Sequence, residues 1–223
     1  MKVTMLGDSI RLFGYGELVT KLLGKEYEFF QPDNCCYSKF TLRGLFDWGP
    51  SMEGSRIVHR NNWLWDVSDY YGDGVLATED EYVTTIVRIA DLLLKKHEKI
   101  IFATTTPVRN DNTYIENSVI ERYNSIIVPA LREKGIIIND LYTPPAKALD
   151  RYISDDKIHL SHEGAKICAE LVAGIIKSTA EALNTDPEAA DDLLRPKKTV
   201  QTECRLNKTD TGQRRKRQYV ARI

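Results

Sequence analysis

Three residues could carry out nucleophilic chemistry together, namely Ser9, Asp156 and His159. Ser9 follows an apolar run that stops at Gly7 and Asp8, as expected of a strand that ends in a sharp turn. A serine exposed in such a turn becomes a nucleophile if a histidine can accept its proton. Asp156 stands three residues before His159, so its carboxylate can accept a hydrogen bond from Nδ1 and leave Nε2 free as the base. The alternative is a helix-capping loop with a solvent-facing histidine.

An oxyanion formed at this serine would need hydrogen-bond donors beside it. The backbone N–H of Ser9, at the turn from strand to helix, is one candidate. Asn61 and Asn62 follow the third expected strand, the neighbour of the first, and a side-chain amide there could reach the same pocket. The alternative for this Asn pair is a simple turn.

The elements between these residues must bring them together. Strands and helices alternate five times, which predicts a parallel sheet with helices on both faces. The expected strands are residues 2–6, 26–30, 56–59, 99–104 and 136–138, and the expected helices are residues 15–24, 40–48, 78–97, 116–134 and 162–183. A flavodoxin-like strand order 2-1-3-4-5 is the simplest topology, and ligands bind such sheets at the carboxyl ends of the strands.

The composition is typical of a soluble globular protein, with 42% hydrophobic and 28% charged residues among 223. No apolar run reaches the roughly 18 residues that span a membrane, and no signal-peptide pattern precedes the first strand, so we expect a cytoplasmic protein. Residues 1–184 are expected to form one domain. Residues 185–223 are expected to form a basic, disordered tail, and its run Arg214-Arg215-Lys216-Arg217 could contact nucleic acid, although a solvated extension is the simpler interpretation.

Together these residues resemble the SGNH hydrolases, also called the GDSL esterase/lipase superfamily. The resemblance rests on Gly7-Asp8-Ser9-Ile10, an asparagine after the third strand and Asp156-x-x-His159, in the family's order over roughly residues 1–183. It implies a three-layer α/β/α domain and serine esterase chemistry without metal, nucleotide or other cofactor. It also implies that Ser9 is the nucleophile, His159 the general base and acid, and Asp156 its orienting partner.

Two blocks of the family pattern are altered in this chain. The family's Gly-x-Asn-Asp is matched by His59-Arg60-Asn61-Asn62, so its glycine and aspartate are both replaced. The resemblance favours Asn61 as the oxyanion donor, with Asn62 as the alternative. The second block lacks its glycine, and the backbone N–H of Ser38 is the expected replacement. The stretches Asn34-Cys35-Cys36 and Asn61-Asn62-Trp63-Leu64-Trp65-Asp66 resemble bacterial members of unassigned substrate, some of which are similar to carbohydrate acetylesterases.

Substrate contacts are expected near the strand ends and in the loops after them. Aromatic rings there could stack on a sugar, although packing inside the protein is an equal alternative for the two tryptophans. The expected contacts are Asp8, Arg11, Tyr15, Trp63, Trp65 and Tyr70. Because no long apolar lid segment is visible, the sequence favours a short acyl group such as acetyl on a polar or carbohydrate carrier.

Two other functions fit the same sequence features. One is a lysophospholipase or thioesterase on the same fold. The other is a protein that binds a ligand without catalysis, because a fold does not fix a function. In every case a small molecule is the expected partner. The basic tail is the only feature that suggests binding of nucleic acid.

Overall fold

Five parallel strands form the central sheet in the order β2-β1-β3-β4-β5. The strands are β1 (Lys2–Gly7), β2 (Glu28–Phe30), β3 (Ile57–Asn61), β4 (Lys99–Ala103) and β5 (Ile137–Asn139). The computed structural model describes residues 1–61 and 63–185. The predicted fold class and strand order are both confirmed. β3 runs two residues further than expected, and Asn61 therefore pairs with Gly7 of β1.

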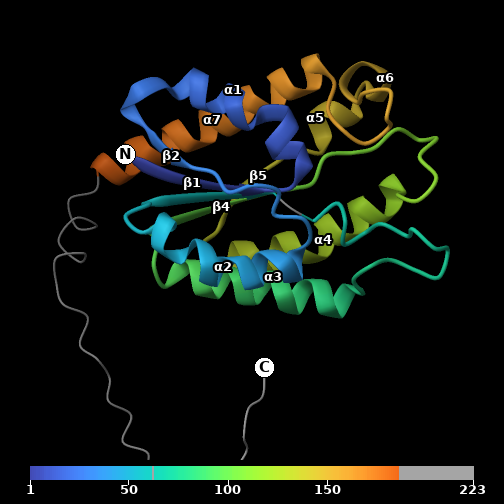
Figure 1. The fold of residues 1–223 in the computed structure, drawn as a ribbon, viewed down its shortest axis with the longest axis horizontal. Coiled ribbons are helices and arrows are strands. Elements are labelled where there is room, and N and C mark those ends of the chain that lie inside the picture. The colour runs from blue at the N-terminus through green and yellow to red at the C-terminus, as the bar shows by residue number, and fades with distance from the viewer. Residues whose placement is uncertain (62, 186–223) are drawn as a thin grey trace, which may run out of the picture. The chain divides into compact units, whose positions relative to one another are not determined.

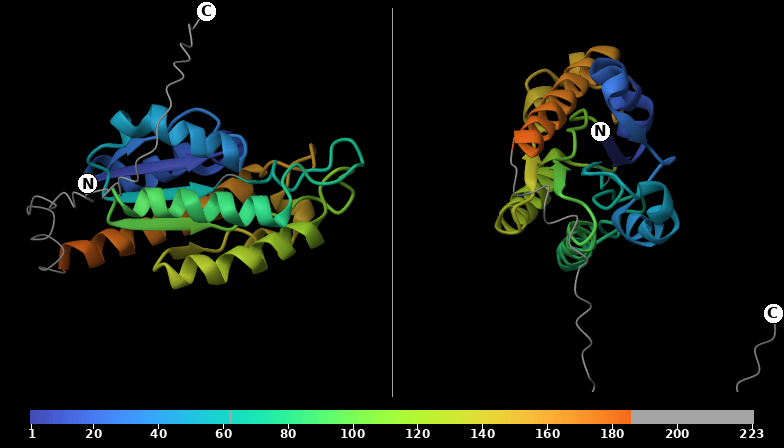
Figure 2. Two further views of the ribbon diagram at one scale, coloured as in Figure 1. Left: turned by 90° about the horizontal axis from the view of Figure 1, so that it is seen from below. Right: turned by 90° about the vertical axis from the view of Figure 1, so that its left-hand side faces the viewer.

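Helices cover both faces of the sheet. Figure 1 shows α1 (Gly16–Leu23) and α7 (His162–Thr185) on one side, and α2 (Ser38–Met52), α3 (Glu79–Leu94) and α4 (Asn117–Glu133) on the other. The right-hand view of Figure 2 shows the same three layers from the end of the molecule. The short helices α5 (Thr143–Ala146) and α6 (Leu149–Tyr152) lie between β5 and α7 in the chain. This arrangement is the predicted α/β/α sandwich.

The core follows from burial of the strands on both faces. Apart from the exposed Lys99, every residue of β3 and β4 is buried, as expected of parallel strands covered by helices. Each helix adds an apolar stripe, such as Ile86, Ile89 and Leu93 of α3. At the start of α3, the predicted capping box of Thr78 and Glu81 is confirmed by both of its hydrogen bonds.

Helix α2 differs from the prediction, because it continues through Gly49 and Pro50 to Met52. Proline normally clashes with the Cβ of the preceding residue in a helix, and Gly49 has no Cβ. The carbonyl of Phe46, which loses its intrahelical donor at Pro50, belongs to a residue that is 81% exposed. The helix can therefore run one turn beyond the expected end.

A turn of π-helix over Ile10–Tyr15, labelled η1, begins directly after Ser9 and was not expected. A short 3₁₀ turn over Gly24–Glu26, labelled η2, likewise follows α1. In η1 the N–H of Leu12 donates to the Asp8 carbonyl at 3.0 Å. The chain after Ser9 is thus already helical where the sequence suggested a loop before residue 15.

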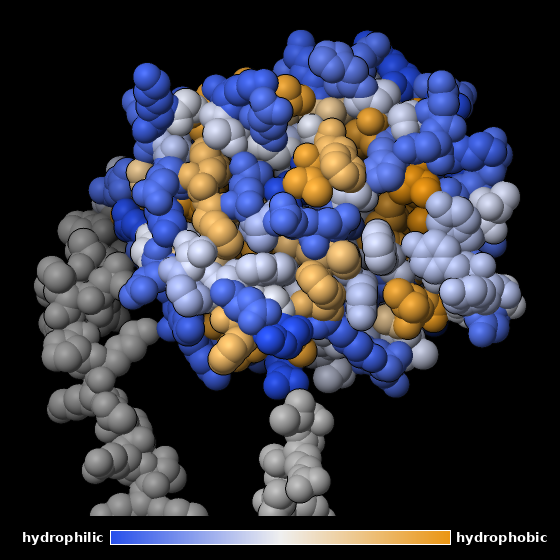
Figure 3. Space-filling model, viewed as in Figure 1, coloured by the Kyte–Doolittle hydropathy of each residue, from blue (hydrophilic) through white to orange (hydrophobic). Residues whose placement is uncertain are grey.

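The surface seen in Figure 3 mixes hydrophobic side chains with hydrophilic ones. In residues 1–61 and 63–185, no helix is both long and apolar enough to cross a membrane. The predicted basic tail, including Arg214-Arg215-Lys216-Arg217, lies outside the described residues apart from Thr185. The domain boundary and the role of the tail stay predictions.

Candidate active site

The serine turn, residues 7–12, places Ser9 at the carboxyl end of β1. The Asp8 N–H donates to the Asn61 carbonyl at 3.0 Å, and Asp8 Oδ1 accepts from the Ile10 N–H at 3.0 Å. A Cβ at Gly7 would lie 2.4 Å from Arg11 Cβ and 2.9 Å from the Asn61 oxygen, so only glycine fits there. The turn is fixed from the buried side, while Ser9 itself remains partly accessible.

The histidine loop, residues 153–160, brings the predicted base to this serine. Nε2 of His159 lies 2.8 Å from Ser9 Oγ, and Nδ1 lies 2.7 Å from Asp156 Oδ2. The side chains of His159 and Asp156 are 34% and 51% exposed, so the hydrogen-bonded chain faces solvent. The three residues singled out from the sequence thus form one continuous hydrogen-bonded array.

The carboxylate of Asp156 is held in its ionised form by its own loop. Its Oδ1 accepts from the Ser154 hydroxyl at 2.7 Å and from the N–H groups of Ile158 and His159 at 2.9 Å. Burial raises the pKa of this carboxyl, but the hydrogen bonds outweigh burial and hold the pKa below its ordinary value. An ionised Asp156 can accept the Nδ1–H of His159 and stabilise the imidazolium.

Arg109, which the sequence reasoning missed, ties the histidine loop to the loop after β4. Its N–H donates to the Lys157 carbonyl at 3.1 Å, and its guanidinium donates to the Ile153 carbonyl at 3.2 and 3.0 Å. The guanidinium also contacts Asp155 Oδ1 at 3.1 Å. Lys157 has a φ of +71°, and its Nζ lies 2.8 Å from Asp111 Oδ2. These contacts fix a strained loop that carries two of the three triad residues.

The structure contradicts the prediction that the Ser38 N–H faces an oxyanion. That N–H donates to Asp66 Oδ2 at 2.9 Å, and the Ser38 hydroxyl donates to Oδ1 at 2.6 Å. Both residues are buried. Asp66 accepts a backbone N–H from the first turn of α2, as a capping carboxylate would. Burial raises the pKa of Asp66 to about 6, although the Ser38 hydroxyl and N–H act to lower it.

Asn61 and Asn62 are the two candidates for the side-chain donor to the oxyanion. Asn61 is fully buried in β3, and its Nδ2 donates to the Thr104 carbonyl at 3.2 Å. Asn62 lies outside the described residues. The assignment of an asparagine amide to the oxyanion therefore stays a prediction, and the hydrogen bond of the Asn61 amide to the Thr104 carbonyl, just after β4, counts against that residue.

Four of the expected substrate contacts are buried side chains. Asp8, Tyr15 and Trp63 have no exposed surface, and Arg11 is 2% exposed. The Arg11 guanidinium donates to the carbonyls of Pro32, Asp33 and Gly7, so it fastens the loop after β2 to the serine turn. This burial contradicts the prediction that these four side chains contact substrate.

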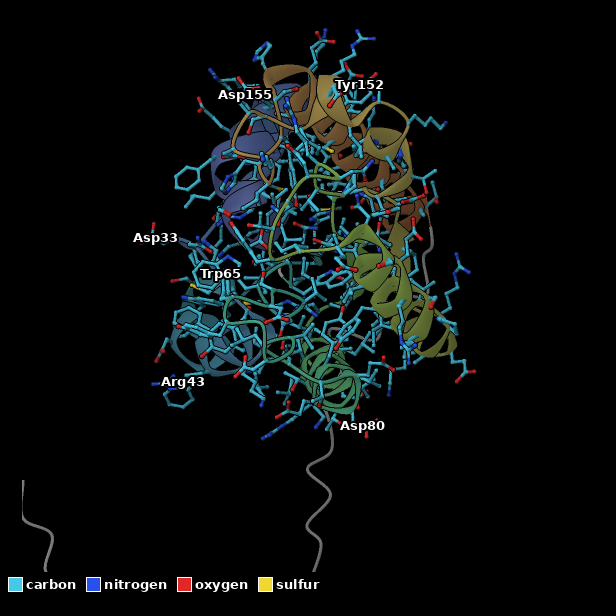
Figure 4. The ribbon with its side chains drawn as sticks, turned by 90° about the vertical axis from the view of Figure 1, so that its right-hand side faces the viewer. Asp33, Arg43, Trp65, Asp80, Tyr152 and Asp155 are labelled. Atoms are coloured by element: carbon cyan, nitrogen blue, oxygen red, sulfur yellow. The ribbon has the colours of Figure 1, made fainter. Side chains whose placement is uncertain are left out.

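Other aromatic side chains do reach the surface at this end of the sheet. Trp65 is partly buried, and Figure 4 labels it on the same loop-bearing face as Asp155 of the histidine loop. Tyr70 is 47% exposed. Phe13, which the sequence reasoning missed, is 75% exposed and lies edge-on to the His159 ring with centroids 6.3 Å apart. Its position in η1, four residues after Ser9, could have drawn attention to it.

The described residues offer no evident metal site. Within residues 1–61 and 63–185, no three His, Cys, Asp or Glu side chains are grouped so that they could hold a metal ion. His59, a candidate by type, is a core residue whose Nε2 lies 3.3 Å from Asn139 Nδ2. Burial, aided by the charge of Arg11, lowers the pKa of His59 to about 3 and keeps the ring neutral.

Comparison with known proteins rests on structure rather than sequence. No protein-family model matches the chain, and no curated protein matches it. An acetyl xylan esterase, AlAXEase, superposes with a TM-score of 0.66 at 20% identity, covering 79% of this chain and 100% of that one. The lipase/acylhydrolase from Enterococcus faecalis gives 0.67 at 17% identity, covering 80% and 96%.

A third solved structure is a member of the lipolytic protein G-D-S-L family from Veillonella parvula DSM 2008. It gives a TM-score of 0.65 at 16% identity, covering 79% of this chain and 98% of that one. The chain has the SGNH hydrolase fold. In this fold, Ser9 follows the carboxyl end of β1, and hydrogen bonds join it to His159 and His159 to Asp156. At these identities the likeness establishes the fold, and the chemistry must be argued from the residues themselves.

Proposed function

We propose that the protein is a serine esterase that hydrolyses a short-chain ester, acetyl in the first instance, on a polar or carbohydrate carrier. The observation that carries the proposal is the continuous array from Ser9 Oγ through His159 to Asp156, with links of 2.8 and 2.7 Å. A solvent-facing histidine in a capping loop would have no reason to meet a serine at a strand end. The array has the geometry that nucleophilic catalysis requires.

In the proposed mechanism, Ser9 Oγ attacks the ester carbonyl while Nε2 of His159 takes the hydroxyl proton. The imidazolium is stabilised by Asp156, which does not itself take the proton. The oxyanion is held by the Ser9 N–H and by an asparagine amide from the Asn61–Asn62 pair. His159 then protonates the leaving alcohol, and an acyl-serine forms. Water, activated by the same imidazole, releases the acid and restores Ser9.

Two observations support a short acyl group. Phe13, exposed against the His159 ring, offers one apolar contact for a small group beside the reacting atoms. Solved structures with this fold include proteins named as an acetyl xylan esterase and an acetyl-xylooligosaccharide esterase. A lysophospholipase would instead need a long apolar surface for its acyl chain.

Hydrolysis of 4-nitrophenyl acetate tests the proposal. Ser9→Ala should lower kcat/KM by at least about 10³-fold, because the nucleophile is lost. Ser178→Ala, which removes an exposed hydroxyl on α7, is the matched control and should change nothing. A fluorophosphonate probe should label the wild type and not Ser9→Ala.

The same assay separates the alternatives. A series of nitrophenyl esters should show the highest kcat/KM at acetate or propionate. A maximum at eight or more carbons would instead indicate a lysophospholipase or thioesterase. Absence of both turnover and a fluorophosphonate adduct would indicate a protein that binds its ligand without catalysis.

A further inference from the structure

A cavity of about 430 Å³ lies between the loop after β3 and the loop after β4. Its lining is mixed, with two tyrosine rings and several side chains that can form hydrogen bonds. The residues that matter here are Asp69, Tyr70, Asn112, Thr113, Tyr114 and Glu116. The triad uses none of them, and no role was assigned to them above except to Tyr70.

Backbone hydrogen bonds shape this cavity in advance of any ligand. The Asp69 N–H donates to the Tyr114 carbonyl at 2.8 Å and joins the two loops. The loop after β3 is closed at its base, where the Leu76 N–H donates to the Ser68 carbonyl at 3.1 Å. The rings of Tyr70 and Tyr114 lie 5.1 Å apart at 33°. A preformed aromatic wall loses little entropy when a ligand packs on it.

The cavity belongs to the same end of the molecule as the triad. The loop that supplies Asn112 and Tyr114 also supplies Arg109 and Asp111, which hold Lys157 of the histidine loop. Figure 1 shows the loops after β3 and β4 extending together beyond the carboxyl edge of the sheet.

The charge of the lining restricts what can bind. Among the described residues that line the cavity none is Lys or Arg, whereas Asp69 and Glu116 are carboxylates. A phosphate or carboxylate on the ligand would be repelled by both of these carboxylates. A long acyl chain would strip water from both carboxylates without replacing their hydrogen bonds. A neutral polyhydroxylated ring suits this lining, because its C–H face can pack on tyrosine while its hydroxyls meet carboxylate and amide groups.

We propose that this cavity is the subsite for a neutral sugar ring that carries the ester. The inference rests on the proposed esterase function, and it names the carrier that this function left open. Tyr70 and Tyr114 supply the stacking surface, and Asp69, Asn112 and Glu116 supply acceptors and donors for the ring hydroxyls. An anionic carrier is excluded from the subsite by the same two carboxylates.

The first test compares two esters. Methyl 6-O-acetyl-β-D-glucopyranoside presents a sugar ring with free hydroxyls, and 4-nitrophenyl acetate does not. For Tyr70→Ala, the ratio of kcat/KM on the sugar ester to that on the nitrophenyl ester should fall by roughly two- to tenfold, through a higher KM. Tyr70→Phe keeps the ring and should restore most of the ratio. Tyr71→Ala is the matched control, because its 88% exposed neighbouring ring does not line the cavity. An unchanged ratio in Tyr70→Ala overturns the inference.

The second test measures binding without hydrolysis. Methyl β-D-glucopyranoside and glucose 6-phosphate are titrated into the Ser9→Ala protein and followed by NMR. The neutral glycoside should bind more tightly, and the added substitution Tyr70→Ala should weaken it. Equal or tighter binding of the phosphate overturns the inference. If the wild type cleaves neither ester, the proposed function fails, and this binding test still decides the subsite on its own.

Discussion

The serine turn and the histidine loop shift the pKa values of two aspartates in opposite directions. Asp8, beside Ser9, is fully buried, and burial raises the pKa of its carboxyl to about 6 although the Ile10 N–H acts to lower it. Asp156, beside His159, is also penalised by burial, but the donors of its own loop lower its pKa below the ordinary value. Burial therefore dominates the pKa of Asp8, whereas hydrogen bonds dominate that of Asp156.

The serine turn and the histidine loop also differ in the contacts that fix them. The serine turn is buried, and much of its support is local, from Gly7 packed against Arg11 and from Asp8. The histidine loop is accessible, and Arg109 supports it from a distant part of the sequence. A buried local turn follows from short sequence patterns, whereas an exposed loop depends on its distant partners.

The largest expected effect is that of Asp156→Asn on catalysis. The new amide would offer N–H to Nδ1 of His159 and so place the ring proton on Nε2, where it cannot accept from Ser9. The asparagine oxygen can still accept from the loop N–H groups, so the fold should persist. We expect kcat on 4-nitrophenyl acetate to fall by about 10⁴-fold, and the thermal midpoint to fall only modestly, because the lowered pKa of Asp156 means that its charge contributes to stability.

Asp150→Asn is the control for this substitution. Asp150 is an exposed residue just before the histidine loop, and its side chain takes no part in the array. The turnover of the Asp150→Asn protein should stay within about twofold of the wild type, as is usual for a surface substitution. Retention of more than a tenth of the activity in Asp156→Asn would mean that the carboxylate does not set the tautomer of His159.

The second prediction concerns Asp8 and the pH dependence of stability. The folded pKa of about 6 lies above the ordinary value of 3.8, so the native state binds more protons than the unfolded state between these values. Ionisation of Asp8 therefore costs the wild type stability as the pH rises from about 4 to 6. Asp8→Asn cannot ionise. Its free energy of unfolding minus that of the wild type should grow by about 2–3 kcal/mol over this range.

Urea unfolding of both proteins at closely spaced pH values measures this difference. Subtraction cancels the opposite contribution of His59, whose lowered pKa makes the common background rise with pH. A constant offset between the two proteins, from altered packing at position 8, leaves the slope unaffected. A difference that is flat from pH 4 to 6 would show that Asp8 titrates normally in the folded protein.

Much of the fold could be predicted, because its signals are short-range. The alternation of apolar strands with amphipathic helices predicts the sheet order, and Gly7-Asp8-Ser9 at the end of the first strand predicts the turn. The triad could also be predicted from the sequence, because Asp156 and His159 lie in one loop and need only a serine at a strand end. Each of these features rests on short sequence patterns, although the fold brings Ser9 to His159 across 150 residues.

The errors concern side chains whose partners are distant. Ser38 faces Asp66, 28 residues away, and no local pattern reports that contact. Extension of β3 to Asn61 buries an amide that looked available in a turn. Trp63 follows a strand, as a binding aromatic would, but its ring packs on Tyr82 of α3 with centroids 5.2 Å apart. Residue type and position near a strand end do not determine which way a side chain faces.

The smallest expected effect tests how Arg109 positions the histidine loop. Arg109→Gln removes the donors to the Ile153 carbonyl, while the backbone N–H to Lys157 survives. The loop should then sample more conformations, and kcat should fall by about tenfold with little change in KM, because a misplaced base slows the step without weakening ground-state binding. Arg109→Lys should recover part of the loss.

Asp155→Ala distinguishes this positioning role from a surface ion pair. The Asp155 side chain is fully exposed, so its contact with Arg109 should be worth little, and kcat should change by less than about twofold. If Asp155→Ala lowered kcat as much as Arg109→Gln, the exposed ion pair, and not the carbonyl of Ile153, would be the contact that fixes the loop. If Arg109→Gln raised KM and left kcat unchanged, the arginine would act on substrate binding. The contrast between a locally fixed nucleophile and a remotely fixed base would then have to be abandoned.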